Sequence, residues 1–271
     1  MSTDNSIKPQ LLKTIREERP LVHHLTNYVT VSDCASITLH WGALPVMAHS
    51  PQESGEMVQG ADALVLNIGT LDENMKAGMI EAAEAATENN IPIVLDPVGV
   101  GATDYRTAFA RHLLNQFNIS VIKGNRGEIS ILTGGEGQVK GVESVGDHGA
   151  LEAAAEELAE SRSAVVVITG EEDLVAGPRG AFRMPGGHEL LGENVGTGCM
   201  LASTIGAFIG AAENELQAAV MTAVSAFGTA AKIAALEKST PAAFIQKFFD
   251  VTARITPDEI EREAEAFRDS E

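Results

Sequence analysis

The chain has 271 residues, 44% of them hydrophobic, and its 38 acidic residues against 19 lysines and arginines give a net charge of −19. A chain of this length and apolar content can bury a full hydrophobic core. Because a surface this acidic repels phosphate backbones and anionic lipids, we expect no nucleic-acid partner and no membrane partner.

The apolar stretches predict buried helices, not membrane spans. Cys199 to Ala212 and Ala218 to Ala231 contain Ser, Thr and Gly and fall short of the roughly 18 to 20 residues that cross a bilayer. Met1 to Arg19 is polar and mixed in charge, unlike a signal peptide. Two cysteines, Cys34 and Cys199, lie far apart and do not suggest a disulfide framework. We therefore expect a cytoplasmic protein.

From residue 63 onward, short apolar runs alternate with longer amphipathic segments, which is typical of an α/β fold with a mostly parallel sheet. The predicted strands are Ala63–Ile68, Ile91–Leu95, Ile119–Ile122 and Ala164–Ile168, with a hairpin at Leu174–Val175 and Gly180–Met184. Besides the two apolar helices, the predicted helices are Asp72–Asn89, Tyr105–Asn115, Glu128–Leu132, Ala150–Glu160 and Asp258–Glu271, and Gly134–Gly149 is predicted to be a loop. No repeat or linker divides the chain, so residues 1–271 are predicted to form a single domain.

Polar residues or glycines follow the carboxyl end of each predicted strand: Asn67 and Gly69, Asp96, Lys123 and Asn125, and Thr169. In open α/β sheets the ligand crevice lies along that edge. Asp96 and Glu128 could hold Mg²⁺ through water there, or each could be a helix cap or a solvated charge. Lys123 could neutralise a phosphate or simply be a solvated lysine at a strand end.

The segment Gly196-Thr197-Gly198 leads directly into the first apolar helix and has the outline of an anion site. Glycines let the backbone approach a phosphate closely, and the unpaired N–H groups of a helix start can hold its charge. Cys199 would lie in the first turn, where the helix field favours thiolate over thiol. The alternative is a Gly-rich turn followed by a buried structural cysteine.

Adjacent histidines, His23 and His24, suggest a metal, but neighbouring side chains on a strand point to opposite faces and no Cys or carboxylate follows at ligand spacing. Zinc is therefore disfavoured. Nearby, Asn27 and Met47 could line a small apolar pocket with one hydrogen-bonding group. For Met47 alone, core packing is the alternative.

Several stretches together resemble the hydroxyethylthiazole kinase family of the ribokinase-like superfamily. They are HLTNYVTVSDCA (24–35), GALPVMA (42–48), ALVLNIGTL (63–71), IPIVLDPVGVGAT (91–103), VIKGNRGE (121–128), VITG (167–170) and VGTGCML (195–201). The resemblance implies a three-layer α/β sandwich, and a homotrimer with the substrate site at the subunit interface. It also implies ATP-dependent phosphorylation of the hydroxyl of 4-methyl-5-(2-hydroxyethyl)thiazole, for thiamine salvage.

By the same resemblance each motif acquires a role. The substrate would contact Asn27, Met47 and Gly196; ATP would contact Lys123 and Thr169; Gly196, Thr197 and Gly198 would form the anion hole; and Asp96 and Glu128 would organise Mg²⁺. Cys199 stands where related sugar kinases carry an aspartate base, so it would accept the alcohol proton. Family members often have Arg at the position of Lys123, where it can contact a phosphate through two hydrogen bonds. Lys123 would instead offer a single point charge.

Other functions stay open within the same superfamily. Kinases for hydroxymethylpyrimidine or pyridoxal, and a nucleotide-dependent dehydratase of hydrated NAD(P)H, usually carry Asp at the position of Cys199. A non-enzymatic nucleotide sensor would need a lost base or lost metal ligands, and the sequence shows neither. All kinase hypotheses require the helix start at Cys199 to face the strand ends that carry Asp96, Lys123 and Glu128.

Overall fold

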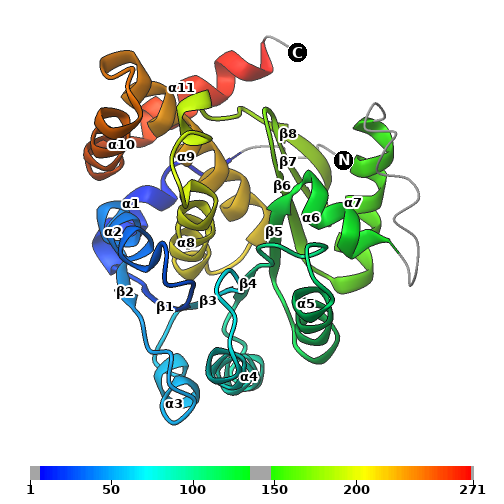
Figure 1. Cartoon of the computed structure of the whole chain (residues 1–271). Coiled ribbons are helices and arrows are strands. Elements are labelled where there is room, and N and C mark those ends of the chain that lie inside the picture. The colour runs from blue at the N-terminus through cyan, green and yellow to red at the C-terminus, as the bar shows by residue number, and fades with distance from the viewer. Residues whose placement is uncertain (1–6, 135–147, 270–271) are drawn as a thin grey trace.

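The computed structural model describes residues 7–134 and 148–269, whose strands form one eight-stranded sheet in the order β2-β1-β3-β4-β5-β6-β7-β8 (Figure 1). The strands are β1 (Leu21–Leu25), β2 (Leu44–Val46), β3 (Ala63–Asn67), β4 (Ile93–Asp96), β5 (Val121–Asn125), β6 (Val165–Thr169), β7 (Asp173–Gly177) and β8 (Gly180–Met184). Strands β1 to β6 are parallel to one another, whereas β7 and β8 pair antiparallel at one edge. The mostly parallel sheet predicted from the sequence is confirmed.

Helices cover both faces of this sheet, which gives the three layers expected of the fold (Figure 1). One face carries α1 (Leu11–Glu18), α2 (Val31–Trp41), α8 (Thr197–Gly210), α9 (Leu216–Glu237), α10 (Pro241–Arg254) and α11 (Pro257–Arg268). The other carries α3 (Ser54–Val58), α4 (Glu73–Glu88), α5 (Asp104–Gln116), α6 (Arg126–Thr133) and α7 (His148–Arg162). A short 3₁₀ helix, η1 (Glu189–Leu191), precedes α8.

Each central strand contributes side chains to two separate hydrophobic cores, one on each face of the sheet. In β3, Ala63 and Val65 belong to the core on the α8 face, whereas Leu64 and Leu66 belong to the core on the α4 face. This alternation follows from the two-residue repeat of an extended strand. Because both faces are covered, the strand reads as a continuous apolar run, which is why the sequence reveals it.

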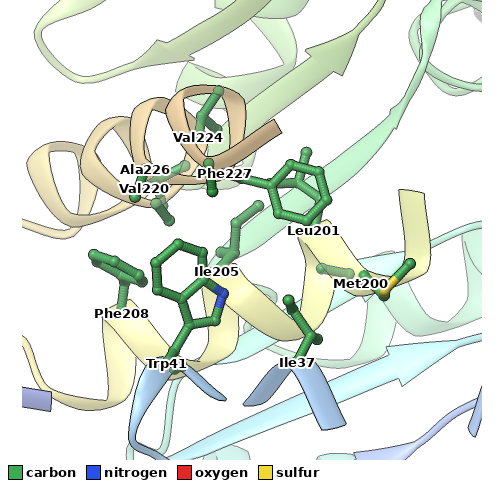
Figure 2. Close-up of a cluster of buried hydrophobic side chains, with 14 of the residues drawn as sticks. Ile37, Trp41, Met200, Leu201, Ile205, Phe208, Val220, Val224, Ala226 and Phe227 are labelled. Atoms are coloured by element: carbon green, nitrogen blue, oxygen red, sulfur yellow. The ribbon is translucent and has the colours of Figure 1, made fainter. Parts of the chain in front are cut away.

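The packing of α8 fixes the direction in which this helix crosses the sheet. Figure 2 shows Trp41 of α2 among the buried side chains of α8 and α9, and its ring meets Phe208 edge-on at 5.6 Å between centroids. The Trp41 indole also donates a hydrogen bond to Thr204 Oγ1 at 2.8 Å. At the far end of α8, Gly210 lies against Pro20 and Ala63 at the start of the strands. The first turn of α8 therefore lies at the carboxyl ends of the strands.

Some elements differ from the sequence-based predictions. The sequence analysis predicted neither strands β1 and β2 nor helices α1, α2, α3 and α10, and the predicted loop Gly134–Gly149 lies mostly outside the described residues. The helix predicted as Ala218–Ala231 is longer, since α9 has 22 residues and is apolar enough to cross a membrane by length and composition. However, 78% of its apolar window is buried inside the protein, as in a core helix.

Candidate active site

The start of α8 meets the strand edge that carries the ionisable residues. A Cβ atom added to Gly198 would lie 3.2 Å from the Lys123 ammonium nitrogen. Two residues earlier, Gly196 has a φ of +89° and packs directly against the Thr30 side chain. Neither position has room for a side chain without displacing its neighbour. The predicted meeting of this helix start with the strand edge is therefore confirmed.

A buried ion pair joins the ends of β4 and β5. Lys123 Nζ lies 3.2 Å from Asp96 Oδ1, and the two residues are 4% and 0% exposed. Burial raises the pKa of the Asp96 carboxyl, and the positive charge of Lys123 partly offsets this rise. Burial alone would lower the pKa of Lys123, but the negative charge of Asp96, reinforced by Cys199 and Glu128, raises it above its ordinary value. The lysine is therefore held in its charged form by its partner.

Cys199 lies in the first turn of α8 and accepts two hydrogen bonds from side-chain amides. Asn27 Nδ2 is 3.3 Å and Asn67 Nδ2 is 3.2 Å from the Cys199 sulfur. Burial, followed by the negative charge of Asp96, raises the pKa of the Cys199 thiol. The positive charge of Lys123 and hydrogen bonds with Thr30 and Asn67 act in the opposite direction. The expectation of a thiolate in the free protein is wrong, because the helix field is outweighed by burial and a nearby carboxylate.

Glu128 caps α6. Its two carboxylate oxygens accept hydrogen bonds from the backbone N–H groups of Gly99 and Asn125, each at 2.9 Å, and the Glu128 backbone N–H donates to Asn125 Oδ1 at 2.9 Å. Among the described residues, no group of three or more His, Cys, Asp or Glu side chains is arranged to hold a metal ion. The site thus offers two carboxylates, a donor set that suits a Mg²⁺ ion retaining several waters.

A cavity of about 750 Å³ opens beside the start of α8. Predicted residues Thr169, Thr197 and Gly198 line it. The rest of its wall comes from the turn between β6 and β7, from the segment before α8 and from two apolar side chains of α8 and α9: Gly170, Glu171, Asp173, Gly187, His188, Glu189, Leu191, Gly192, Leu201 and Phe227. Its size and mixed lining suit a nucleotide-sized ligand.

The two residues predicted to bind a small substrate lie in different settings. Asn27 is buried, and its Oδ1 accepts hydrogen bonds from the backbone N–H of Val29 and from Thr30. Its amide nitrogen reaches Cys199, so Asn27 belongs to the site. Met47 is half-buried after β2, the strand at the sheet edge, and takes no part in the hydrogen bonds around Cys199.

The paired histidines of β1 are core residues. His23 Nε2 lies 2.8 Å from the carbonyl oxygen of Ala48, and His24 Nδ1 lies 3.0 Å from that of Val22. Burial lowers the pKa of His24 to about 3. Both rings therefore contact backbone carbonyls, and His24 stays neutral at physiological pH.

A mostly parallel sheet between two helical layers, with a glycine-rich helix start at its carboxyl edge, defines a ribokinase-like fold. The chain superposes on a ribokinase-like superfamily protein from Enterococcus faecalis with a TM-score of 0.62 at 12% identity, covering 97% of this chain and 98% of the other. At that identity the likeness concerns the fold alone.

The chain belongs to the hydroxyethylthiazole kinase family, whose sequence profile matches residues 12–258. A relative named hydroxyethylthiazole kinase from Thermoanaerobacter pseudethanolicus is 46% identical over 259 residues, 95% of this chain and 98% of its own. The solved hydroxyethylthiazole kinase protein of Pyrococcus horikoshii is 42% identical, with a TM-score of 0.84 over 93% of this chain and 94% of its own. The family resemblance read from the sequence motifs is confirmed.

Proposed function

We propose that the protein transfers the γ-phosphoryl group of ATP to the hydroxyl of 4-methyl-5-(2-hydroxyethyl)thiazole, as the names of its relatives suggest. The observation that carries this proposal is the start of α8, which brings Cys199 and backbone amides against the buried Lys123–Asp96 pair. The 750 Å³ cavity adjoins the same helix start. Together these features provide a place for a nucleotide, for its transferred phosphate and for an acceptor.

The nucleotide would occupy this cavity with its phosphates toward Gly196, Thr197 and Gly198. Amides at a helix start hold anionic oxygens and stabilise the charge that develops on the transferred group. Lys123, already charged beside Gly198, would neutralise the γ-phosphate, and Thr169 would contact the nucleotide from the end of β6. Phosphoryl transfer has a loose transition state, so positioning supplies most of the acceleration.

Asp96 and Glu128 would hold Mg²⁺ through bound water. Each carboxylate keeps oxygen lone pairs beyond those used by Lys123, Asn67 and the backbone amides. When bound, the ion would neutralise part of the charge on the phosphate oxygens. The role of the two residues is to fix its position at the strand edge.

The acceptor alcohol would lie between Asn27, Met47 and Gly196, with its oxygen near Cys199. As the oxygen bonds to phosphorus and the bond from phosphorus to the leaving ADP oxygen breaks, the alcohol proton passes to the ionised sulfur of Cys199. We further propose that the whole chain is one domain working in the cytoplasm, and that it assembles as a homotrimer. Exposed Tyr28 and Val29 beside Asn27, at 56% and 67%, support such a contact.

Cys199→Ala is expected to lower kcat by about a hundredfold, the lower end of what a general base contributes, while ATP binding changes little because the cavity wall is intact. The thiol pKa is raised, so wild-type kcat should increase with pH as sulfur loses its proton. This dependence should disappear in the variant. Steady-state rates between pH 6 and pH 10, with ATP binding measured by calorimetry, check this. An unchanged turnover would remove Cys199 from the mechanism.

Substrate choice is tested by ATP consumption with thiazole alcohol, pyridoxal and hydroxymethylpyrimidine as alternative acceptors. We expect ADP to form with the thiazole alcohol at a rate at least about tenfold above either rival, since one unmade buried hydrogen bond alone costs that much. Hydrated NADH with ATP serves as the fourth arm and tests dehydratase activity. Turnover of any rival above that of the thiazole alcohol would reject the proposed substrate.

A further inference from the structure

Asn67, the last residue of β3, has every hydrogen-bonding position of its side chain engaged. It is 1% exposed. Its amide nitrogen donates to Asp96 Oδ2 at 2.6 Å and to the Cys199 sulfur at 3.2 Å. Its oxygen accepts from Asn27 Nδ2 at 3.1 Å and from the Gly69 backbone at 3.0 Å. An amide has two donors and two acceptor lone pairs, so no position is left over.

These hydrogen bonds determine the orientation of the Cys199 sulfur and which positions around it are occupied. The sulfur has three tetrahedral positions besides its bond to Cβ, and amides of Asn67 and Asn27 occupy two of them. The thiol proton, or an incoming proton once the sulfur is ionised, shares the remaining position with the Thr30 side chain, which also hydrogen-bonds the sulfur. Two N–H donors favour the ionised form, against burial and Asp96.

We propose that Asn67 is a positioning residue that orients the Cys199 sulfur and the Asp96 carboxylate together, so that the ionised sulfur is held in place to receive the acceptor's proton. This role rests on the proposed function in assigning that proton to Cys199. An acid at position 67 could not substitute, because it would add a carboxylate beside Asp96 and would have no N–H to donate. Position 67 therefore requires an amide side chain, which donates N–H groups without adding a negative charge.

The test uses iodoacetamide, which alkylates the Cys199 thiolate and releases iodide without needing ATP or the thiazole alcohol. Charged or titratable neighbours of the sulfur are Asp96, Lys123 and Cys34, and all three are kept. In Asn67→Leu, the alkylation rate of Cys199 at pH 8 should fall about tenfold, the usual effect of losing one hydrogen bond to a charged group. The rate-against-pH curve should move to higher pH.

The kinetic readout should separate positioning from general loosening. We expect kcat of Asn67→Leu to fall about tenfold, while KM for ATP changes less than about threefold because Asn67 does not line the nucleotide cavity. Cys34 is an internal control, since it is fully buried and burial raises its thiol pKa to about 11. Labelling of Cys34 in the variant would reveal a loosened fold.

If Asn67→Leu does not fold, Asn67→Ser keeps one donor and should give a smaller shift in the same direction. A folded variant alkylated at the wild-type rate at every pH would overturn the proposal. A shifted curve with unchanged kcat would also overturn it, because orientation of the sulfur would then not matter for transfer. A shifted curve in a protein whose wild type does not phosphorylate the thiazole alcohol would support Asn67's control of the sulfur and reject the proposed function.

Discussion

Asp96→Asn is expected to reduce phosphoryl transfer by at least about a hundredfold, the scale set by removal of a single charge-stabilising group from an active site. The substitution keeps the shape of the side chain but removes the negative charge that would organise Mg²⁺. It also removes the partner that keeps Lys123 charged. Steady-state kinetics with a Mg²⁺ titration measure the effect, and an unaltered metal requirement would count against the assignment of Asp96.

The same variant should be less stable by about 3–5 kcal/mol, because Lys123 would be buried without its partner. In the wild type, the raised pKa of Lys123 stabilises the folded protein until the pH rises through that pKa. In the variant, burial is opposed only by the weaker effects of Cys199 and Glu128, so we expect the pKa of Lys123 to fall below its ordinary value and the unfolded state to bind more protons. The stability deficit should therefore shrink as the pH rises from 7 to 10. Urea denaturation at several pH values measures it.

Two controls distinguish the charge of Asp96 from a general effect of removing a carboxylate. Asp104→Asn removes an exposed carboxylate from the first turn of α5 and should change stability and turnover little. Lys123→Met in the Asp96→Asn background removes the unpaired charge, so stability should recover while activity stays lost. Recovery of activity in this double variant would show that neither residue takes part in transfer.

The parts of the fold that the sequence reveals are those with uniform local patterns. Strands β3 to β6 are buried on both faces and appear as short apolar runs, and their order along the chain predicts a parallel sheet. In contrast, β1 contains adjacent histidines and β2 is a three-residue strand with a central Pro45. Burial of neutral histidines against backbone carbonyls is a tertiary effect. Sequence patterns alone do not reveal it.

The site also has features that the local sequence reveals and features that depend on the tertiary structure. The positions of Asp96, Lys123 and the glycines before Cys199 follow from strand ends and a helix start, which are local features. The protonation of Cys199 does not, because it depends on burial and on a carboxylate 103 positions away in the sequence. Asn67 was visible as a polar residue at a strand end, but its role requires knowing that Cys199 lies 3.2 Å away.

Gly198→Ala should separate stability from activity. A methyl group there would lie 3.2 Å from the Lys123 ammonium nitrogen, in the space through which a phosphate would approach the amides of α8. Alanine is the better helix former, by up to about 1 kcal/mol, and the flexible lysine can shift slightly. We therefore expect unchanged or slightly higher stability, with kcat/KM for ATP lower by about a hundredfold. Thermal unfolding and steady-state kinetics measure the two effects.

Gly196→Ala is the matched comparison, two residues earlier in the same segment. Its φ of +89° disfavours any residue with a side chain, and the added methyl group would collide with Thr30. This variant should therefore lose stability, by about 1–3 kcal/mol, as well as activity. If Gly198→Ala were as unstable as Gly196→Ala, packing would be the reason for both glycines. If Gly198→Ala kept full activity, no phosphate group could pass through this space during transfer, and the proposed anion hole at the start of α8 would be wrong.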